Sequence, residues 1–161
     1  MRNLGDVPGA ISAFDRCASL DGWAEEAAWA RYQEATCWLT LGMERAAVTA
    51  CAAGLLCHPG VAELAWLAGF ALWRAKRYED AVWWSRLAIV HGATMEGGAS
   101  VARIGFRNPM ALYEGPYDVL RHALKALNRH EAAEEAERRF EEAKRLRSEA
   151  RDRVDPVAAA G

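Results

Sequence analysis

Apolar residues recur every three or four positions along most of the chain, and no stretch alternates regularly between apolar and polar residues. This spacing places the apolar side chains along one side of an α-helix. It predicts helices over residues 29–41, 44–57, 64–75 and 79–91, and a further pair towards the C-terminus. We therefore expect an all-α chain with six or seven helices in antiparallel pairs and no sheet.

The pattern of small and large residues returns after 34 positions, as in Ala35 and Gly69. Small residues at these places let two helices approach closely, and a period near 34 is the signature of a tetratricopeptide (TPR) helix-turn-helix unit. The chain resembles this family over residues 5–147. The matching positions are Gly42, Ala47, Pro59, Gly69, Tyr78, Ala81 and Ala88. The resemblance implies a TPR-like solenoid of helical hairpins wound into a right-handed superhelix.

The period divides a helical repeat domain, residues 1–153, into unequal parts. We expect a half-repeat at 5–20, full repeats at 28–61, 62–92 and 115–147, an insertion at 93–114 and a flexible tail at 154–161. Lys76 takes the place of the helix-ending glycine of the preceding unit. The half-repeat has no first helix in front of it, so either Met1 is not the natural start or another element covers this helix.

The insertion before the last repeat begins in a glycine-rich stretch, Gly92 to Gly98, which we expect to end the preceding helix. It carries more large apolar residues than a disordered linker. We therefore expect residues 92–116 to fold back as an ordered lid beside Trp66 and Phe70, or onto the first helix of the last repeat.

The last helix is expected to run past Ala143 and to end before Pro156. Acidic and basic residues four positions apart favour ion pairs along a solvated capping helix. The expected pairs are Glu134 with Arg138, Glu135 with Arg139, and Glu141 with Arg145.

Composition restricts the class of protein. The chain has 161 residues, of which 52% are hydrophobic and 26% charged, as in globular proteins. A formal net charge of -2 argues against a nucleic-acid ligand. No apolar run approaches the roughly 20 residues of a membrane span, and the N-terminus lacks the apolar core of a signal peptide. We expect a cytoplasmic protein with no membrane partner.

Candidate chemistry is sparse. Cys17, Cys37, Cys51 and Cys57 have irregular spacings and are expected to be small core residues, with no metal site. We find no nucleophile with its base, no pair of carboxylates in a pocket and no phosphate-binding loop. His122, His130 and Asp118 are expected to be solvated. The sequence therefore predicts no catalytic residue and no cofactor.

Aromatic residues gather on the first helices of the two central repeats, which should line the concave face of a solenoid. Helical spacing places on this face Trp29, Tyr32, Thr36, Leu39, Glu63, Trp66, Phe70 and Trp73, with Arg74 at the edge. The predicted function is a non-catalytic scaffold that binds a peptide or protein in this groove. The alternative, that these aromatics pack against neighbouring repeats or under the insertion, stays open.

Trp83 and Trp84 are adjacent on a second helix and should point about 100° apart, so at least one should face outwards. An exposed tryptophan is a marker of protein interfaces. This leads to an alternative function, a structural module that oligomerises through Trp83, Trp84 and the N-terminal helix. Tryptophans lying flat against the neighbouring helix are the other interpretation.

A second resemblance is confined to the end of the chain. Residues 106–120, with the helix that follows to Arg145, resemble the helical repeat region appended to the C-terminal side of some bacterial family 2 glycosyltransferases. Members of that group also have a nucleotide-sugar-binding domain with a D-x-D metal motif, which this sequence lacks. The resemblance implies an accessory region for acceptor binding or oligomerisation, with a glycosyltransferase catalytic domain as partner and no transferase activity of its own.

Overall fold

The computed structural model describes residues 5–19, 23–96 and 108–154, and these are helical with no strand among them. The helices are α1 (Val7–Ser19), α2 (Ala24–Thr40), α3 (Glu44–Cys57), α4 (Ala62–Arg74), α5 (Tyr78–Glu96), α6 (Pro109–Leu112), α7 (Gly115–Ala126) and α8 (His130–Val154). The all-α prediction is confirmed. The helix count is corrected to eight within the described ranges, because the short α6 lies in the predicted insertion.

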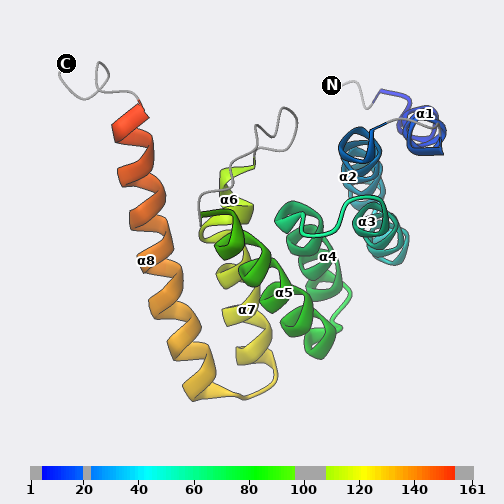
Figure 1. Ribbon diagram of the computed structural model, residues 1–161. Coiled ribbons are helices and arrows are strands. Elements are labelled where there is room, and N and C mark those ends of the chain that lie inside the picture. The colour runs from blue at the N-terminus through cyan, green and yellow to red at the C-terminus, as the bar shows by residue number, and fades with distance from the viewer. Residues whose placement is uncertain (1–4, 20–22, 97–107, 155–161) are drawn as a thin grey trace.

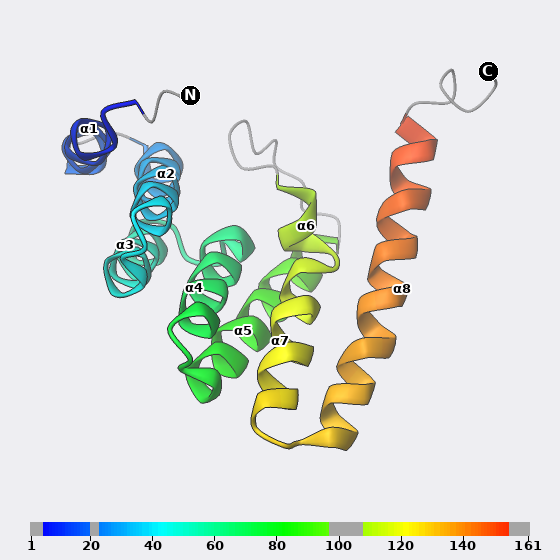
Figure 2. The ribbon, with the colours of Figure 1, turned by 180° about the vertical axis from the view of Figure 1, so that it is seen from behind.

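Three helical hairpins follow α1: α2 with α3, α4 with α5, and α7 with α8. Each helix packs on the next along the chain, and α7 takes the place beside α5 after the excursion through α6. Figures 1 and 2 show the resulting row of helices, with α1 at one end and α8 at the other. The first helices of the hairpins also meet, since α4 contacts both α2 and α7.

The three hairpins share one turn geometry. Gly42, Lys76 and Asn128 each adopt a left-handed backbone, with φ of 71°, 60° and 58°. In each turn the amide of this residue donates to the carbonyl three residues before it, and the next amide donates to the carbonyl five residues before it. This is the Schellman arrangement that satisfies the last carbonyls of a helix. Lys76 and Asn128 therefore occupy the place of a helix-ending glycine.

Small residues lie where the helices of a hairpin approach each other. Ala47, Ala81 and Ala133 are buried at the start of the three second helices. Gly69 of α4 faces α5, and a Cβ atom there would stand 3.1 Å from Ser85 Oγ. The sequence identified Ala47, Gly69 and Ala81 as close-contact positions, and their burial agrees with that prediction.

The N-terminal helix packs on α2 through a junction that is partly polar. Ile11 is the buried residue of α1. Arg31 of α2 reaches back to Asp15 at 2.6 Å and also binds Glu34 at 2.7 Å. Glu34 is itself buried and accepts a hydrogen bond from the indole of Trp38 at 3.2 Å. An ion pair thus joins α1 to α2 beside the apolar contact of Ile11.

Two expectations about helix ends are corrected. The glycine-rich stretch does not end the helix at Gly92, because α5 continues to Glu96. Gly92 is buried, and a Cβ atom there would lie 3.6 Å from the carbonyl oxygen of Leu112, an ordinary contact distance, so α5 packs against the end of α6 at this residue. Tertiary packing here outweighs the cost of about 1 kcal/mol for a glycine in a helix. Helix α2 also begins at Ala24, before Trp29, and buries Ala27 in its first turn.

The last helix ends at Val154, before Pro156, as expected. Its ion pairs differ in detail. Arg139 binds Glu135 at 3.1 Å, as predicted. Arg138 turns to Glu135 instead of Glu134, and Arg145 approaches Glu149 at 3.9 Å instead of Glu141. Spacing of three residues competes with spacing of four on a helix surface, so the pairing could not be fixed from spacing alone.

Candidate binding face

The first helices α2, α4 and α7 present one continuous face, which we call the first-helix face. On α2 the rings of Trp29 and Tyr32 stack with centroids 5.6 Å apart and planes 11° apart. Trp29 is 38% exposed, whereas Tyr32 is half-buried. Thr36, one turn further along, is exposed. This part of the face offers an aromatic pair beside a polar side chain.

On α4 the rings of Phe70 and Trp73 stack at 6.1 Å, and the guanidinium of Arg74 lies 6.0 Å from the Phe70 centroid. Arg74 also donates to the carbonyl of Leu39 at 3.2 Å and binds Glu44 at 3.1 Å. These contacts hold Arg74 across the boundary between the first and second hairpins. Both aromatic rings are half-buried, so they contribute to packing as well as to the surface.

The face continues onto α7 through His122, whose ring lies 5.9 Å from that of Trp73. The imidazole Nδ1 lies 2.7 Å from the carbonyl oxygen of Asp118. His122 is exposed, as expected, but it also makes a contact between two hairpins. The sequence contained a signal that His122 lies on this face. The interval from Ala81 to Ala133 also takes Phe70 to His122 and Trp66 to Asp118.

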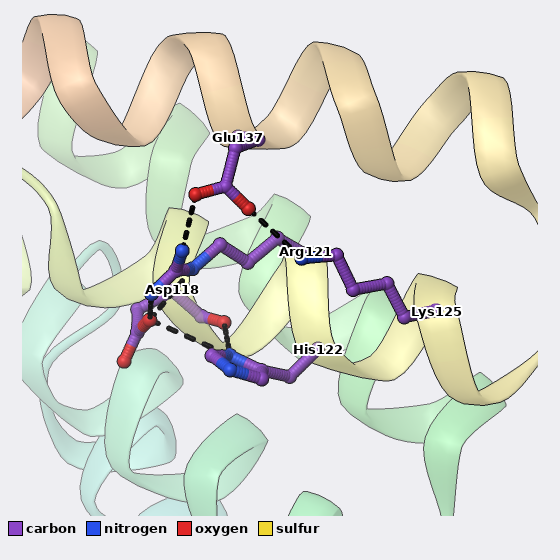
Figure 3. Close-up of polar contacts among 5 residues, drawn as sticks. All are labelled: Asp118, Arg121, His122, Lys125 and Glu137. Carbon is purple, nitrogen blue, oxygen red and sulfur yellow. Dashed lines mark hydrogen bonds and ion pairs between the residues drawn. The ribbon is translucent and has the colours of Figure 1, made fainter.

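Next to His122, a network of charged side chains joins α7 to α8 (Figure 3). Arg121 binds Asp118 at 2.6 Å and also binds Glu137, and Lys125 binds Glu137 at 3.0 Å. Burial lowers the pKa of Arg121, but its hydrogen bonds to the two carboxylates outweigh this and raise the pKa overall. The guanidinium also lies 4.0 Å from the ring of Phe140. Arg121 is therefore a fixed cation at the hairpin contact and offers little to a ligand.

Two residues expected on this face are buried. Glu63 is 1% exposed and Leu39 is 7% exposed, so neither is available to a ligand. Burial raises the pKa of the Tyr32 hydroxyl, and the nearby charge of Glu63 adds to this effect. The seven-residue spacing placed both residues on the inner side of the first helices, but it could not show that neighbouring elements cover them.

The short helix α6 covers the upper part of the first-helix face. Asn108 caps α6 by accepting from the amide of Met110 at 3.2 Å, and its side-chain amide donates to the Tyr32 hydroxyl at 3.2 Å. Trp66 lies beside the start of α7, with its Nε1 atom 2.8 Å from where a Cβ of Gly115 would be. Helix α6 also contacts α5 and α7. The chain thus returns onto the array beside Trp66, in agreement with part of the predicted lid, while residues 97–107 lie outside the described ranges.

Trp83 and Trp84 lie on α5, away from the first-helix face, with ring centroids 5.3 Å apart in an edge-to-face contact. Trp83 is 60% exposed, which agrees with the prediction that at least one of them faces outwards. Trp84 is half-buried against the core around Leu64 and Leu67. Only Trp83 of this pair is therefore a candidate interface residue.

The described residues hold no group of three or more His, Cys, Asp or Glu side chains that could ligate a metal ion. None of the helices in these ranges is long and apolar enough to cross a bilayer. No family model, no curated protein and no solved structure matches the chain. The first-helix face is thus judged on its geometry alone.

Proposed function

We propose that the chain is a non-catalytic repeat scaffold of TPR type that binds a peptide or a protein segment on the first-helix face. In this proposal the hairpins α2–α3, α4–α5 and α7–α8 are successive repeats, and the first helices line the concave side of a right-handed superhelix. The binding residues are Trp29, Tyr32, Thr36, Phe70, Trp73 and Arg74.

The repeat assignment is supported by the recurrence of the left-handed turn residue at Gly42, Lys76 and Asn128. These positions are separated by 34 residues and then by 52, which exceeds one period by 18 residues. Because turn geometry sets the crossing of the two helices, equal turns favour equal hairpins, and stacked equal hairpins form a solenoid.

The binding assignment rests on one observation, that this face already holds a segment of the chain. Residues 108–112 lie on it, with Asn108 tied to Tyr32 and α6 packed on α4. Below this segment Trp73 and His122 meet beside Arg74, so aromatic, basic and hydrogen-bonding groups are adjacent. Such a mixture suits an extended or helical peptide.

A phage-displayed peptide library selected on the folded chain provides the test. Peptides that bind the first-helix face should bind a Trp73→Ala variant at least about tenfold more weakly, because a buried aromatic anchor carries much of an interface's affinity. Thr36→Arg adds a bulky charge at an exposed point of the same face and should have a similar effect. Circular dichroism checks that both variants keep their helices.

Trp83→Ala is the matched control, since it removes an indole from α5 on a different face. Selected peptides should bind this variant as they bind the parent chain. Peptides whose affinity falls with Trp83→Ala and stays unchanged with Trp73→Ala and Thr36→Arg would refute the assignment of the first-helix face.

A glycosyltransferase catalytic domain is the partner that the resemblance of residues 106–120 suggests. In that case the chain would be an accessory region and the face would hold an acceptor or the enzyme itself. A binding measurement between this chain and an isolated family 2 catalytic domain would test it, and no saturable binding would count against it.

An interaction through α5 is the second candidate function, favoured by the 60% exposure of Trp83. Val90, one heptad further along α5, is also exposed, so the two side chains share a stripe. The N-terminal helix gives this alternative little support, because its outward side chains include Ser12, Asp15 and Arg16. If Trp83→Ala abolished self-association, this alternative would replace the peptide-binding scaffold as the main function.

A further inference from the structure

The end of the array at α8 carries an unusual set of charges. In the first two hairpins, apolar residues of the second helix pack in clusters shared with the next hairpin. These are Val48 and Leu55 on α3, and Val82 and Ile89 on α5. The corresponding positions on α8 are Glu134 and Glu141, and Glu137 between them is bound by Arg121 and Lys125 of α7. A further hairpin could not pack on Glu134 and Glu141 without burying carboxylates.

Glu134 and Glu141 belong to a stripe of residues along α8, and beyond Glu141 the charge of this stripe changes from negative to positive. Lys144, Ser148 and Arg151 continue it at helical spacing, and they line one shallow hollow together with Glu141. All of these side chains are exposed. Within the described residues Glu134, Glu141 and Arg151 form no ion pair, and Lys144 only approaches the ring of Phe140 at 5.5 Å. The stripe is therefore acidic in its first half and basic in its second, and four of its charged residues, Glu134, Glu141, Lys144 and Arg151, have no ion-pair partner within the described residues.

We infer that α8 pairs in antiparallel orientation with α8 of a second copy of this chain. A two-fold axis between residues 142 and 143 places Glu141 opposite Lys144 of the other copy. The same axis places Glu134 opposite Arg151 of the other copy. It also places Ser148 opposite Glu137, whose carboxylate is already bound by Arg121 and Lys125. A single two-fold axis thus gives all three of these pairs of facing residues, and each pair occurs twice by symmetry.

The shape of the molecule allows this contact. Helix α8 stands at the edge of the row of helices in both views, and none of the other helices that the structure describes lies on its outer side (Figures 1 and 2). The stripe from Glu134 to Arg151 extends about 25 Å along the helix axis. The first-helix face and Trp83 lie on other helices, so they remain available to other partners.

Exposed ion pairs are individually weak and are screened by salt. The dimer is therefore a weak, salt-sensitive one, and its salt dependence tests the inference without any substitution. In sedimentation equilibrium, the weight-average mass should rise with concentration towards that of a dimer at about 50 mM NaCl. At about 500 mM NaCl the association should weaken at least about tenfold, because the screening length falls to a few ångströms.

Charge-reversal substitutions test whether the stripe on α8 forms the contact between the two copies. Lys144→Glu with Arg151→Glu makes all the charged residues of the stripe acidic. Glu134→Lys with Glu141→Lys makes them all basic except Glu137, which Arg121 and Lys125 bind. Each double variant should be monomeric, and a mixture of the two should form a heterodimer. The fourfold variant E134K/E141K/K144E/R151E keeps the symmetry with reversed signs and should dimerise as the parent chain does.

The matched control is Arg45→Glu with Arg86→Glu, which changes the net charge as much as the acidic double variant does but at exposed positions on α3 and α5. It should leave the association unchanged. A parent chain that is monomeric at low salt, an association that salt does not weaken, or a control that weakens it as much as K144E/R151E would each overturn the inference. Failure of a folded fourfold variant to dimerise would refute the two-fold geometry.

Discussion

Gly69 lies against Ser85 so closely that a Cβ atom at position 69 would stand 3.1 Å from the serine hydroxyl and 3.4 Å from its backbone nitrogen. The corresponding residues of the last hairpin are Arg121 and Glu137, which form an ion pair. One repeat position is thus occupied by a close contact of small residues in the second hairpin and by a charged network in the third. The same turn geometry therefore accommodates two different ways of joining a pair of helices.

Larger side chains at the close-contact positions should destabilise the fold. We expect Gly69→Leu and Ala81→Leu to lower the free energy of unfolding by about 1 to 3 kcal/mol each, because added methylenes in a packed helix contact force the helices apart. Ala47→Leu, at the equivalent position of the first hairpin, should behave like Ala81→Leu. Urea denaturation monitored by circular dichroism measures the change.

The control for these substitutions is Glu131→Ala, an exposed residue of α8 that forms no ion pair within the described ranges. Its effect should stay within about 0.5 kcal/mol. Equal losses from Glu131→Ala and Ala81→Leu would show that position 81 is not a packed helix contact.

Glycine in place of Lys76 should stabilise the turn between α4 and α5. Lys76 has a φ of 60°, a left-handed conformation that costs a residue with a Cβ atom roughly 1 kcal/mol. We therefore expect Lys76→Gly to raise the free energy of unfolding by up to about 1 kcal/mol, and Gly42→Ala to lower it by a similar amount. Differential scanning calorimetry would detect both as shifts of Tm in opposite directions.

Ala75→Gly is the control for the turn, since Ala75 has an ordinary φ of -75°. This change should lower stability, because glycine there gains no relief from strain and loses more entropy on folding. If Lys76→Gly and Ala75→Gly shifted Tm in the same direction, the left-handed backbone of Lys76 would be in doubt.

Acid should weaken the contact between α7 and α8. The hydrogen bond from Lys125, and then the charge of Arg121, lower the pKa of Glu137 below its usual value. At pH values near the ordinary Glu pKa of about 4.3, the unfolded chain binds more protons at this residue than the folded chain does. The stabilising contribution is therefore present above that pH and is lost as the pH falls through the lower, folded-state pKa.

Glu137→Gln separates this contribution from that of the other carboxylates. Urea titrations from about pH 6 to about pH 3 should show a smaller loss of stability for the variant than for the parent chain. Identical pH profiles would mean that Glu137 titrates alike in the folded and unfolded states.

Trp66 should matter for stability rather than for ligand binding. It is half-buried against the start of α7, and its Nε1 atom is buried without a hydrogen-bond partner within the described ranges. Trp66→Ala should cost about 2 to 4 kcal/mol by leaving a cavity. Trp66→Phe should cost much less, because no hydrogen bond is lost and most of the apolar contact remains. Chemical denaturation of both variants tests this, and equal losses would contradict the packing of Trp66 in this core.

The sequence predicted the helices and their spacing well, because these depend on local and periodic information. The interval from Ala47 to Ala81 and then to Ala133 located three buried helix contacts. The same intervals place His122 at the position equivalent to Phe70, although the change of residue type obscured this match, and His122 contacts Trp73. The prediction failed at Gly92, where propensity favoured an end to the helix and contact with α6 extended it.

By itself, then, the sequence determined the helical class, the hairpins and the positions of close approach, since each follows from spacing along one chain. Only the tertiary structure decided which members of the aromatic set are covered. Glu63, Trp66 and Trp73 share a helical stripe, yet Glu63 is buried, whereas Trp66 and Trp73 are half-buried and Trp73 meets His122. Residues far apart in sequence cause this difference, as when Asn108 reaches Tyr32. Helical periodicity shows which side a residue is on, but burial depends on what the rest of the chain places there.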